Sequence, residues 1–332
     1  MFRSRRGVQI AAVVAGLALA ATACSTTGGK KAQQNASDVS AGKASTPHMT
    51  FAMITHQSPG DTFWDIVRKG ALAAAAKDNV TLKYSSDPDS TKQAALVRDA
   101  VDSKVDGIAV TLANPQAMTP AVKAADAAGI PVVAFNSGLD AWQQAGAMEY
   151  FGSDEILAGE TAGRRASQEG YKHVLCIPQE QGQVALEERC SGVEKTFTGK
   201  YTKVYVNGTD LPSVRTTITA KLKQDPSVDL VIMLGAPYAL AAIQSVKDAG
   251  SKAKVATFDF NSQIPGKIKS GEIQWAIDQQ PWLQGYLAVD SLWLYKVNGN
   301  VIGGGNKVPT GPYFIDKSNV SSIAKYAARG TR

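Results

Sequence analysis

From Met49 onward, short apolar runs alternate with longer alanine-rich amphipathic segments, and this alternation restricts the fold more than any other feature of the chain. Four of the runs are "TFAMIT" (50–55), "DGIAVTL" (106–112), "VDLVIML" (228–234) and "KVATFDF" (254–260). Most runs are nearly continuous in Val, Ile, Leu or Ala, which is typical of strands buried on both faces. The intervening segments have the length and pattern of helices: 62–78, 90–103, 116–128, 153–169, 184–198, 212–224, 236–249 and 281–297. Alternating strands and helices predict parallel sheets covered by helices on both faces.

The number and spacing of the runs predict two sheets. About ten runs are many for one open sheet but suit two. The first four units end near "AFNSG" (134–138), and a fresh series begins near "YFGSDE" (150–155). We therefore predict two similar α/β lobes, each with a doubly wound parallel sheet. Ligands of such sheets bind beyond the carboxyl ends of the strands, so the residues that follow each run are the candidates for a site.

Aromatic, cationic, acidic and amide side chains follow these runs. The candidates are Asp61, Phe63, Trp64, Asn136, Arg189, Asp259 and Gln279. Aromatic rings cover the apolar C–H face of a sugar ring, Asp accepts hydroxyl hydrogens, and Arg donates through a fixed fork. Because neighbours on a helix point about 100° apart, we expect that Phe63 and Trp64 do not share one core and that one of them needs a second partner. The mixture suits a neutral polyhydroxy ligand.

Structural roles stay open for several of these residues. Arg189 can pair with one of the two glutamates before it, and Asp61 and Asp259 can each cap a helix. We interpret His56 as structural, since a lone histidine after a strand usually is. Three tryptophans are interpreted as packing residues: Trp142, Trp275 and Trp282.

The first 23 residues have the parts of an export signal. The charged segment "MFRSRRG" precedes the apolar "VQIAAVVAGLALAATA" (8–23), which is too short to span a bilayer. Ala21 and Ala23 suit signal cleavage, and Cys24 directly after them resembles the lipidated cysteine of a bacterial lipoprotein. We predict a signal peptide over 1–23, lipidation at Cys24 and a flexible tether over 24–47. Plain secretion is the alternative.

Two cysteines remain after Cys24. Export to an oxidising compartment predicts a disulfide between Cys176 and Cys190, which would contribute about 3 kcal/mol through loop closure. Two buried thiols are the alternative. Two cysteines with no nearby histidine make a poor metal site, so neither a metal nor a cofactor is predicted.

Charge and motifs disfavour other function classes. The net charge is +6, and without the three arginines of the export signal 32 basic and 29 acidic residues remain. No basic stripe interleaved with aromatics stands out, so nucleic-acid binding has little support. The chain contains neither "GxSxG" nor "HExxH", which argues against a secreted α/β enzyme, although an acid–base pair of carboxylates stays open.

The residues from 49 to about 315 resemble the type I periplasmic sugar-binding proteins, the ribose-binding-protein-like solute-binding proteins of ABC transporters. In that family, two aromatics open the first helix and stack on the sugar, which matches "FW" at 63–64. An arginine in an "RxRG"-like stretch matches Arg189, an aspartate in "FD" matches Asp259, and a glutamine at the interlobe crossing matches Gln279 in "DQQP".

Two positions depart from the ribose-binding pattern. Asn136 and Ser137 stand where ribose binders carry Asp-Arg, and Gly235 stands where they carry Asn. Both changes remove hydrogen-bonding capacity toward a ligand, so ribose itself is not the expected ligand.

The resemblance also implies an arrangement and a function. A first lobe of 48–152 plus 280–308 and a second lobe of 153–279 plus 309–325 would be joined by a multi-strand hinge that bends to trap the ligand. The implied function is extracytoplasmic capture of a monosaccharide or polyol by a monomer, without catalysis, and delivery to an ABC-type permease. A sensor that presents its ligand to a membrane receptor is the alternative. A sugar-responsive repressor would need a DNA-binding segment where this chain has an export signal.

Overall fold

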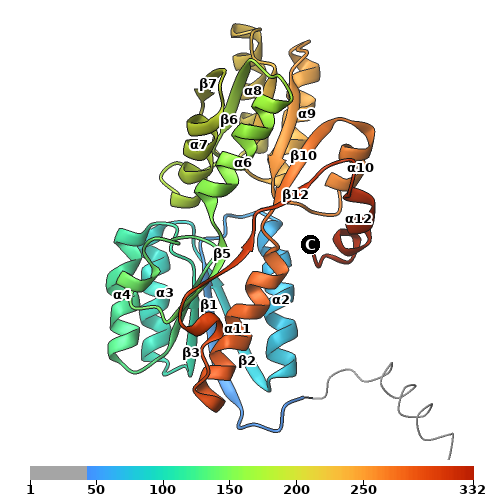
Figure 1. Ribbon diagram of the computed structural model, residues 1–332. Coiled ribbons are helices and arrows are strands. Elements are labelled where there is room, and N and C mark those ends of the chain that lie inside the picture. The colour runs from blue at the N-terminus through green and yellow to red at the C-terminus, as the bar shows by residue number, and fades with distance from the viewer. Residues whose placement is uncertain (1–42) are drawn as a thin grey trace, which may run out of the picture. The chain divides into compact units, whose positions relative to one another are not determined.

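The computed structural model describes residues 43–332. The predicted signal peptide, Cys24 and most of the predicted tether lie outside these residues. The described chain forms two lobes, each built on a six-stranded sheet (Figure 1). The prediction of two α/β lobes with doubly wound, largely parallel sheets is confirmed.

The first lobe has an entirely parallel sheet with strand order β11-β5-β4-β3-β1-β2. Its strands are β1 (Met49–Thr55), β2 (Val80–Ser86), β3 (Gly107–Val110), β4 (Val132–Phe135), β5 (Glu149–Ser153) and β11 (Lys307–Gly311). Its helices are α2 (Phe63–Lys77), α3 (Ser90–Asp102), α4 (Pro115–Ala127), α5 (Trp142–Ala145) and α11 (Pro281–Asn298), with the 3₁₀ turn η1 (Ile302–Gly304).

The second lobe repeats this plan with strand order β12-β10-β9-β8-β6-β7. Its strands are β6 (His173–Ile177), β7 (Lys200–Lys203), β8 (Leu230–Met233), β9 (Lys254–Phe258), β10 (Ile273–Asp278) and β12 (Tyr313–Ile315). Its helices are α6 (Glu155–Gln168), α7 (Val184–Thr196), α8 (Leu211–Gln224), α9 (Ala236–Asp248), α10 (Ile264–Ser270) and α12 (Val320–Arg329). Only β12 runs antiparallel to its neighbour, β10.

The apolar runs form strands that are buried on both faces. In β1, Phe51 and Met53 join the apolar cluster on one face of the sheet, whereas Ala52 and Ile54 join the cluster on the other face. The strand β6 divides its residues between two clusters in the same way. A continuous apolar run is therefore required, because each residue of the strand meets helices.

The chain crosses between the lobes three times, from β5 to α6, from β10 to α11 and from β11 to β12. The sequence pattern missed the last two strands. Both are short, and Pro309 interrupts β11, which lies at the edge of its sheet where a missing N–H is tolerated.

Among residues 43–332, no helix combines the length and hydropathy that crossing a bilayer requires.

In each lobe, glycines bring one pair of helices into backbone contact. A Cβ atom on Gly70 of α2 would lie 1.9 Å from the carbonyl oxygen of Trp282 in α11. A Cβ atom on Gly159 of α6 would lie 2.1 Å from the carbonyl oxygen of Arg189 in α7. These two close pairs fix the positions of α2 and α7, the helices that carry candidate site residues.

Candidate ligand-binding site

A cavity lies between the two lobes, beyond the carboxyl ends of strands from both sheets. Its walls include all seven predicted site residues, and its volume is about 30 Å³. We call it the inner cavity. The other wall residues are His56, Gln179, Glu180, Gln183, Ala185, Leu186 and Leu234. A smaller adjoining hollow of about 10 Å³ shares Asp61, Phe63, Gln179 and Asp259 with it.

Phe63 and Trp64 supply the aromatic wall at the start of α2. The two rings meet edge to face with centroids 5.2 Å apart, and Trp64 also meets the ring of His56 at 4.8 Å. Both rings belong to one apolar cluster and both line the inner cavity. The expectation that they do not share a core is therefore wrong, because rings in the first turn of a helix can meet edge to face. Asp61 accepts a hydrogen bond from the backbone N–H of Phe63 at 3.0 Å, so it does hold the start of this helix.

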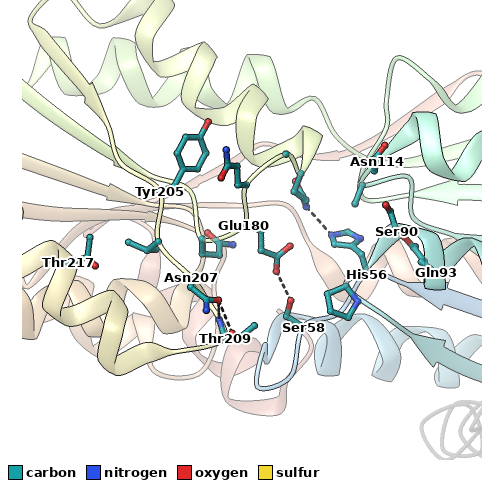
Figure 2. Close-up of a pocket in the computed structure, with 17 residues that line it drawn as sticks. His56, Ser58, Ser90, Gln93, Asn114, Glu180, Tyr205, Asn207, Thr209 and Thr217 are labelled. Carbon is teal, nitrogen blue, oxygen red and sulfur yellow. Dashed lines mark hydrogen bonds between the residues drawn. The ribbon is translucent and has the colours of Figure 1, made fainter.

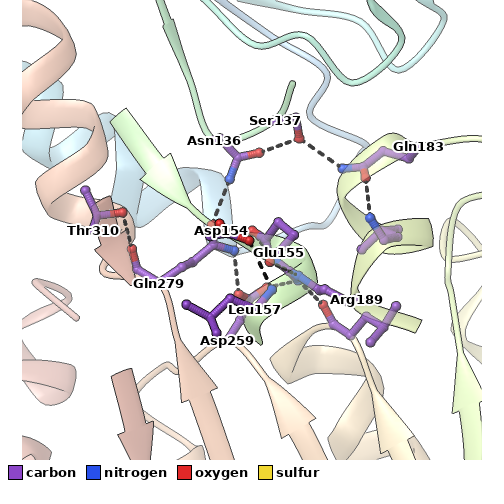
Figure 3. A network of polar contacts seen from close by, with 12 residues as sticks. Asn136, Ser137, Asp154, Glu155, Leu157, Gln183, Arg189, Asp259, Gln279 and Thr310 are labelled. Atoms are coloured by element: carbon purple, nitrogen blue, oxygen red, sulfur yellow. Dashed lines mark hydrogen bonds and ion pairs between the residues drawn. The ribbon is translucent and has the colours of Figure 1, made fainter. Parts of the chain in front are cut away.

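Arg189 projects from the second lobe and is 3% exposed. Its Nε and Nη2 donate to the two oxygens of Glu155 at 2.7 and 3.0 Å, and its Nη1 donates to the carbonyl oxygen of Leu234 at 3.0 Å (Figure 3). Its carboxylate partner is thus the first residue of α6 rather than one of the two glutamates before it. These bonds use three of the five N–H groups of the guanidinium, which leaves one N–H on each terminal nitrogen.

Asp259 follows β9 and lies close to the guanidinium, with its Oδ2 3.8 Å from Nη1 of Arg189. Burial raises the pKa of Asp259 to about 7, although Arg189 opposes the shift. Asp259 does not cap the next helix, since α10 begins only at Ile264. Its backbone lies in the left-handed region at φ 65°. Such strain in a residue other than glycine is concentrated at functional sites.

Asn136 occupies the matching place after β4 and has φ 66°. Its Nδ2 donates to Oε1 of Gln279 at 3.1 Å and to Oε1 of Gln284 at 3.2 Å (Figure 3). Its Oδ1 accepts from Ser137 at 3.1 Å. Because both N–H groups of the amide are used, Asn136 offers a ligand only acceptor capacity.

Gln279 joins the two lobes at the crossing after β10. Its Nε2 donates to Oδ1 of Asp259 at 2.7 Å, and its Oε1 accepts from Asn136 and from Gln284. Gln284 in α11 and Thr310 in β11 complete this buried network, in which Gln284 donates to Thr310 at 3.1 Å. One N–H of Gln279 remains for a ligand.

Contacts between the lobes lie between the inner cavity and the outer surface (Figure 2). Ser58 donates to Glu180 at 2.8 Å, and Gln183 donates to Nε2 of His56 at 2.9 Å. The backbone N–H of Val184 donates to the carbonyl oxygen of Ala113 at 3.0 Å. Burial, and then Arg189, lower the pKa of His56 to about 3, so the ring stays neutral and accepts from Gln183. Outside these contacts lies a larger outer cavity of about 580 Å³ that opens to solvent.

Cys176 of β6 and Cys190 of α7 form a disulfide with their Cα atoms 6.0 Å apart. The bond ties α7 to the sheet next to Arg189. Two of the three tryptophans interpreted as packing residues, Trp142 and Trp275, are buried, and Trp282 stacks on Tyr286. None of the three lines the inner cavity. Among residues 43–332, no group of three or more His, Cys, Asp or Glu residues could hold a metal ion.

The sequence pattern missed several residues of the site. Glu155 follows β5, and the wall residues Gln179, Glu180 and Gln183 follow β6, so the rule that pointed to the other strand ends also applies to them. Gln284 lies inside α11 and carries no such signal. Gly235 is the N-cap of α9 and borders the adjoining hollow.

Comparison with known proteins agrees with this geometry. Residues 51–300 match the family model of the periplasmic binding protein domain. A carbohydrate transporter from Acidothermus cellulolyticus 11B, crystallised in complex with myo-inositol, is 70% identical with a TM-score of 0.86, and the match covers 86% of this chain and 100% of that one. An ABC transporter solute-binding protein from Agrobacterium vitis with bound D-fucose is 25% identical with a TM-score of 0.76, over 84% of this chain and 99% of that one.

A ribose-binding relative is similar in sequence at lower identity. The ribose import binding protein of Bacillus subtilis (strain 168) is 26% identical over 235 residues, which are 69% of this chain and 76% of that protein. Because the family model spans well over half of the chain, and a 70% identical structure covers most of it, this chain belongs to the periplasmic binding protein family.

Proposed function

We propose that this protein captures a neutral monosaccharide or polyol in the inner cavity and delivers it to an ABC importer, with a cyclitol such as myo-inositol as the first candidate. One observation carries the proposal: two aromatic rings from one lobe line the same cavity as a buried arginine and carboxylate from the other lobe. The rings cover apolar C–H faces, and the polar groups pair with hydroxyls.

The unused hydrogen-bonding capacity of the walls suits hydroxyl groups. Two N–H groups of Arg189 and one of Gln279 are free to donate, while the carboxylates of Asp61 and Asp259 accept. Burial raises the pKa of Asp61 to about 6 and that of Asp259 to about 7. Hydroxyl donors from a ligand would replace the hydration that the half-buried Asp61 and the buried Asp259 have lost.

The charge of the walls favours a neutral ligand. When ionised, Asp259 and Glu155 together exceed the single positive charge of Arg189, and Asp61 adds further negative charge. A phosphate or carboxylate on the ligand would be repelled in this low-dielectric space. The 70% identical protein from Acidothermus cellulolyticus holds myo-inositol, a neutral ring with a hydroxyl on every carbon, which supports this ligand class.

Isothermal titration calorimetry tests the ligand class. We expect myo-inositol to bind more tightly than ribose, D-arabinose, D-allose or D-fucose, and inositol monophosphate not to bind. Absence of binding to every neutral sugar and polyol would contradict the proposal. Tight binding of the phosphate ester would contradict the charge argument.

We further propose that the protein is exported, lipidated at Cys24 and monomeric. The sequence pattern of residues 1–47 supports export and anchoring. In cells, the wild-type protein should be found with the membrane fraction, and Cys24→Ala should release it or leave it unprocessed. Light scattering of the chain without its signal peptide should give the mass of one copy.

Delivery to a permease is tested in the cell. Deletion of the gene should abolish uptake of radiolabelled myo-inositol at low external concentration, and the wild-type gene should restore it. Unchanged uptake together with a lost transcriptional response would favour the sensor alternative instead.

A further inference from the structure

Gln179 carries an amide that the binding site described above does not use. It follows β6, is 7% exposed, and lines the inner cavity, the adjoining hollow and the outer cavity. Its Oε1 is shielded from solvent and has no hydrogen-bond partner within residues 43–332. Buried acceptors without a partner are costly and rare, so each one asks for an explanation.

Oε1 of Gln179 differs in its position from the other buried polar atoms that lack a hydrogen-bond partner. Within the described residues, the other buried side-chain atoms without a partner belong to Asp78, Gln93, Glu149, Tyr201 and Arg332. None of those residues lines the inner cavity. Among the described residues, Oε1 of Gln179 is therefore the one side-chain acceptor in the wall of the inner cavity that is both shielded from solvent and without a partner.

Gly235 leaves the space that this amide needs. A Cβ atom at Gly235 would lie 3.0 Å from the ring of Tyr238 and 3.6 Å from Nε2 of Gln179. A larger side chain at this position would have to displace one of the two. The backbone of Gln179 is held as well, since Gly208 donates to its carbonyl oxygen at 2.9 Å. The backbone that carries this amide is thus held in place, and Gly235 leaves room beside it.

We propose that Gln179 binds the ligand directly, with its Oε1 accepting a hydrogen bond from one ring hydroxyl, and that this contact selects a ring with a hydroxyl donor at that position. The inference rests on the proposed function and deepens it. A cyclitol presents a hydroxyl on every ring carbon. A pyranose has one ring oxygen without a hydrogen, and placing that oxygen against Oε1 would leave two acceptors unpaired.

Calorimetry on matched variants tests this contact. Gln179→Leu keeps most of the side-chain volume and removes the amide. Gln181→Leu makes the same change at an exposed position on the same loop, outside the inner cavity. We expect Gln179→Leu to weaken myo-inositol binding about 10- to 100-fold and Gln181→Leu to leave it within about twofold.

A set of monodeoxy derivatives of myo-inositol separates direct contact from general damage. For the derivative that lacks the hydroxyl read by Gln179, the wild type and Gln179→Leu should bind equally well. The other derivatives should keep the difference. The melting temperature of ligand-free Gln179→Leu should equal or exceed that of the wild type, because the change removes an unpaired buried acceptor.

Two results would overturn the inference while the proposed function stands. One is wild-type-like binding of myo-inositol by Gln179→Leu, and the other is an equal loss for every deoxy derivative. If the wild-type protein bound no sugar or polyol, the proposed function would fail and this inference with it.

Discussion

The two lobes share one architecture but contribute different chemistry to the cavity between them. The first lobe supplies the rings of Phe63 and Trp64, a neutral histidine and an amide, with Asp61 as its one carboxylate. The second lobe supplies the buried guanidinium of Arg189 with its carboxylate partners. A ring held between them would meet an apolar wall on one side and a charged network on the other.

Asn136 and Asp259 show how one backbone position serves both chemistries. Each follows a central strand of its sheet, has φ near 65°, and donates its N–H to a residue of the next strand, Phe151 or Ile277. Only the second lobe has a buried cation beside this position. The fold therefore fixes the position of the residue that follows this strand. The neighbouring charge decides whether that residue can be a carboxylate or an amide.

The helices that carry these groups are positioned in the same way in both lobes. Glycines let α2 approach α11 and α7 approach α6. The first pair places the aromatic rings, and the second places Arg189. The second pair has an additional constraint, because the disulfide ties α7 to β6.

The largest effect is expected from removing the positive charge of Arg189 in the second lobe. Arg189→Met leaves Glu155, which is 2% exposed, buried without its partner. We expect a loss of about 3–5 kcal/mol in the free energy of unfolding. Ligand affinity should fall more than about 100-fold, since two charged donors are lost. Urea denaturation and calorimetry measure the two effects.

Two further variants separate stability from binding at this position. Arg164→Met removes an exposed ion pair with Glu160 on α6 and should leave stability nearly unchanged, because solvent screens such pairs. The double variant Arg189→Met with Glu155→Leu should regain stability but not affinity. Restored binding in the double variant would contradict a direct role for the guanidinium.

The second-largest effect on stability is expected from removing the disulfide, which constrains only the second lobe. Replacing Cys176 and Cys190 together by alanine should lower the free energy of unfolding by about 3 kcal/mol, because the unfolded chain regains the entropy of a loop with a sequence separation of 14. Denaturation of the wild type with and without reductant provides the control. Unchanged stability in the double variant would show that the glycine contacts alone hold α7.

The next test exchanges the carboxylate of Asp259 and the amide of Asn136, which occupy matching positions in the two lobes. Asp259→Asn should weaken binding about 10- to 100-fold, since an amide accepts hydroxyl hydrogens less strongly than a carboxylate. Asn136→Asp should instead destabilise the fold by about 1–3 kcal/mol. Gln279 and Gln284 would lose a donor, and a carboxylate would be buried with no cation beside it.

Asp259 also makes both properties depend on pH. In the folded protein, the pKa of the Asp259 carboxyl is about 7. In the unfolded chain, this pKa has its ordinary value of 3.8. Between these values the folded state binds more protons, so this group's contribution to stability falls as pH rises. Affinity should rise over the same range, because hydroxyls donate to the ionised form. Asp259→Asn should flatten both profiles, and an unchanged affinity profile would contradict the assignment.

The fold and most of the cavity wall could be predicted from the sequence because parallel strands gather their carboxyl ends at one edge. Residues as distant as Asp61 and Gln279 therefore line one cavity. Their roles as ligand contacts stay predictions. The edge strands β11 and β12 were missed, since a short strand held by its partners needs no apolar run of its own.

Other parts of the site could not be read from the pattern because they depend on which strands and helices lie opposite each other. Glu155 meets Arg189 only because α6 packs against α7 at a glycine contact. Gln284 reaches the cavity network from the interior of a helix. Gly235 looked like a lost ligand contact, whereas in the structure it leaves room beside Gln179.

The smallest of these effects concerns the aromatic wall of the first lobe. Phe63→Leu and Trp64→Leu each keep an apolar group but remove the flat face, so we expect affinity to fall about 3- to 30-fold for every ring ligand. The order of preference among ligands should stay the same, because an aromatic face covers C–H groups and does not read hydroxyl positions. Trp142→Leu is the matched control, since Trp142 is buried in the same lobe but outside the inner cavity, and it should lower stability without changing affinity. If the ring variants reordered the panel, the rings would take part in selecting hydroxyls, and the division of roles between the lobes would be wrong.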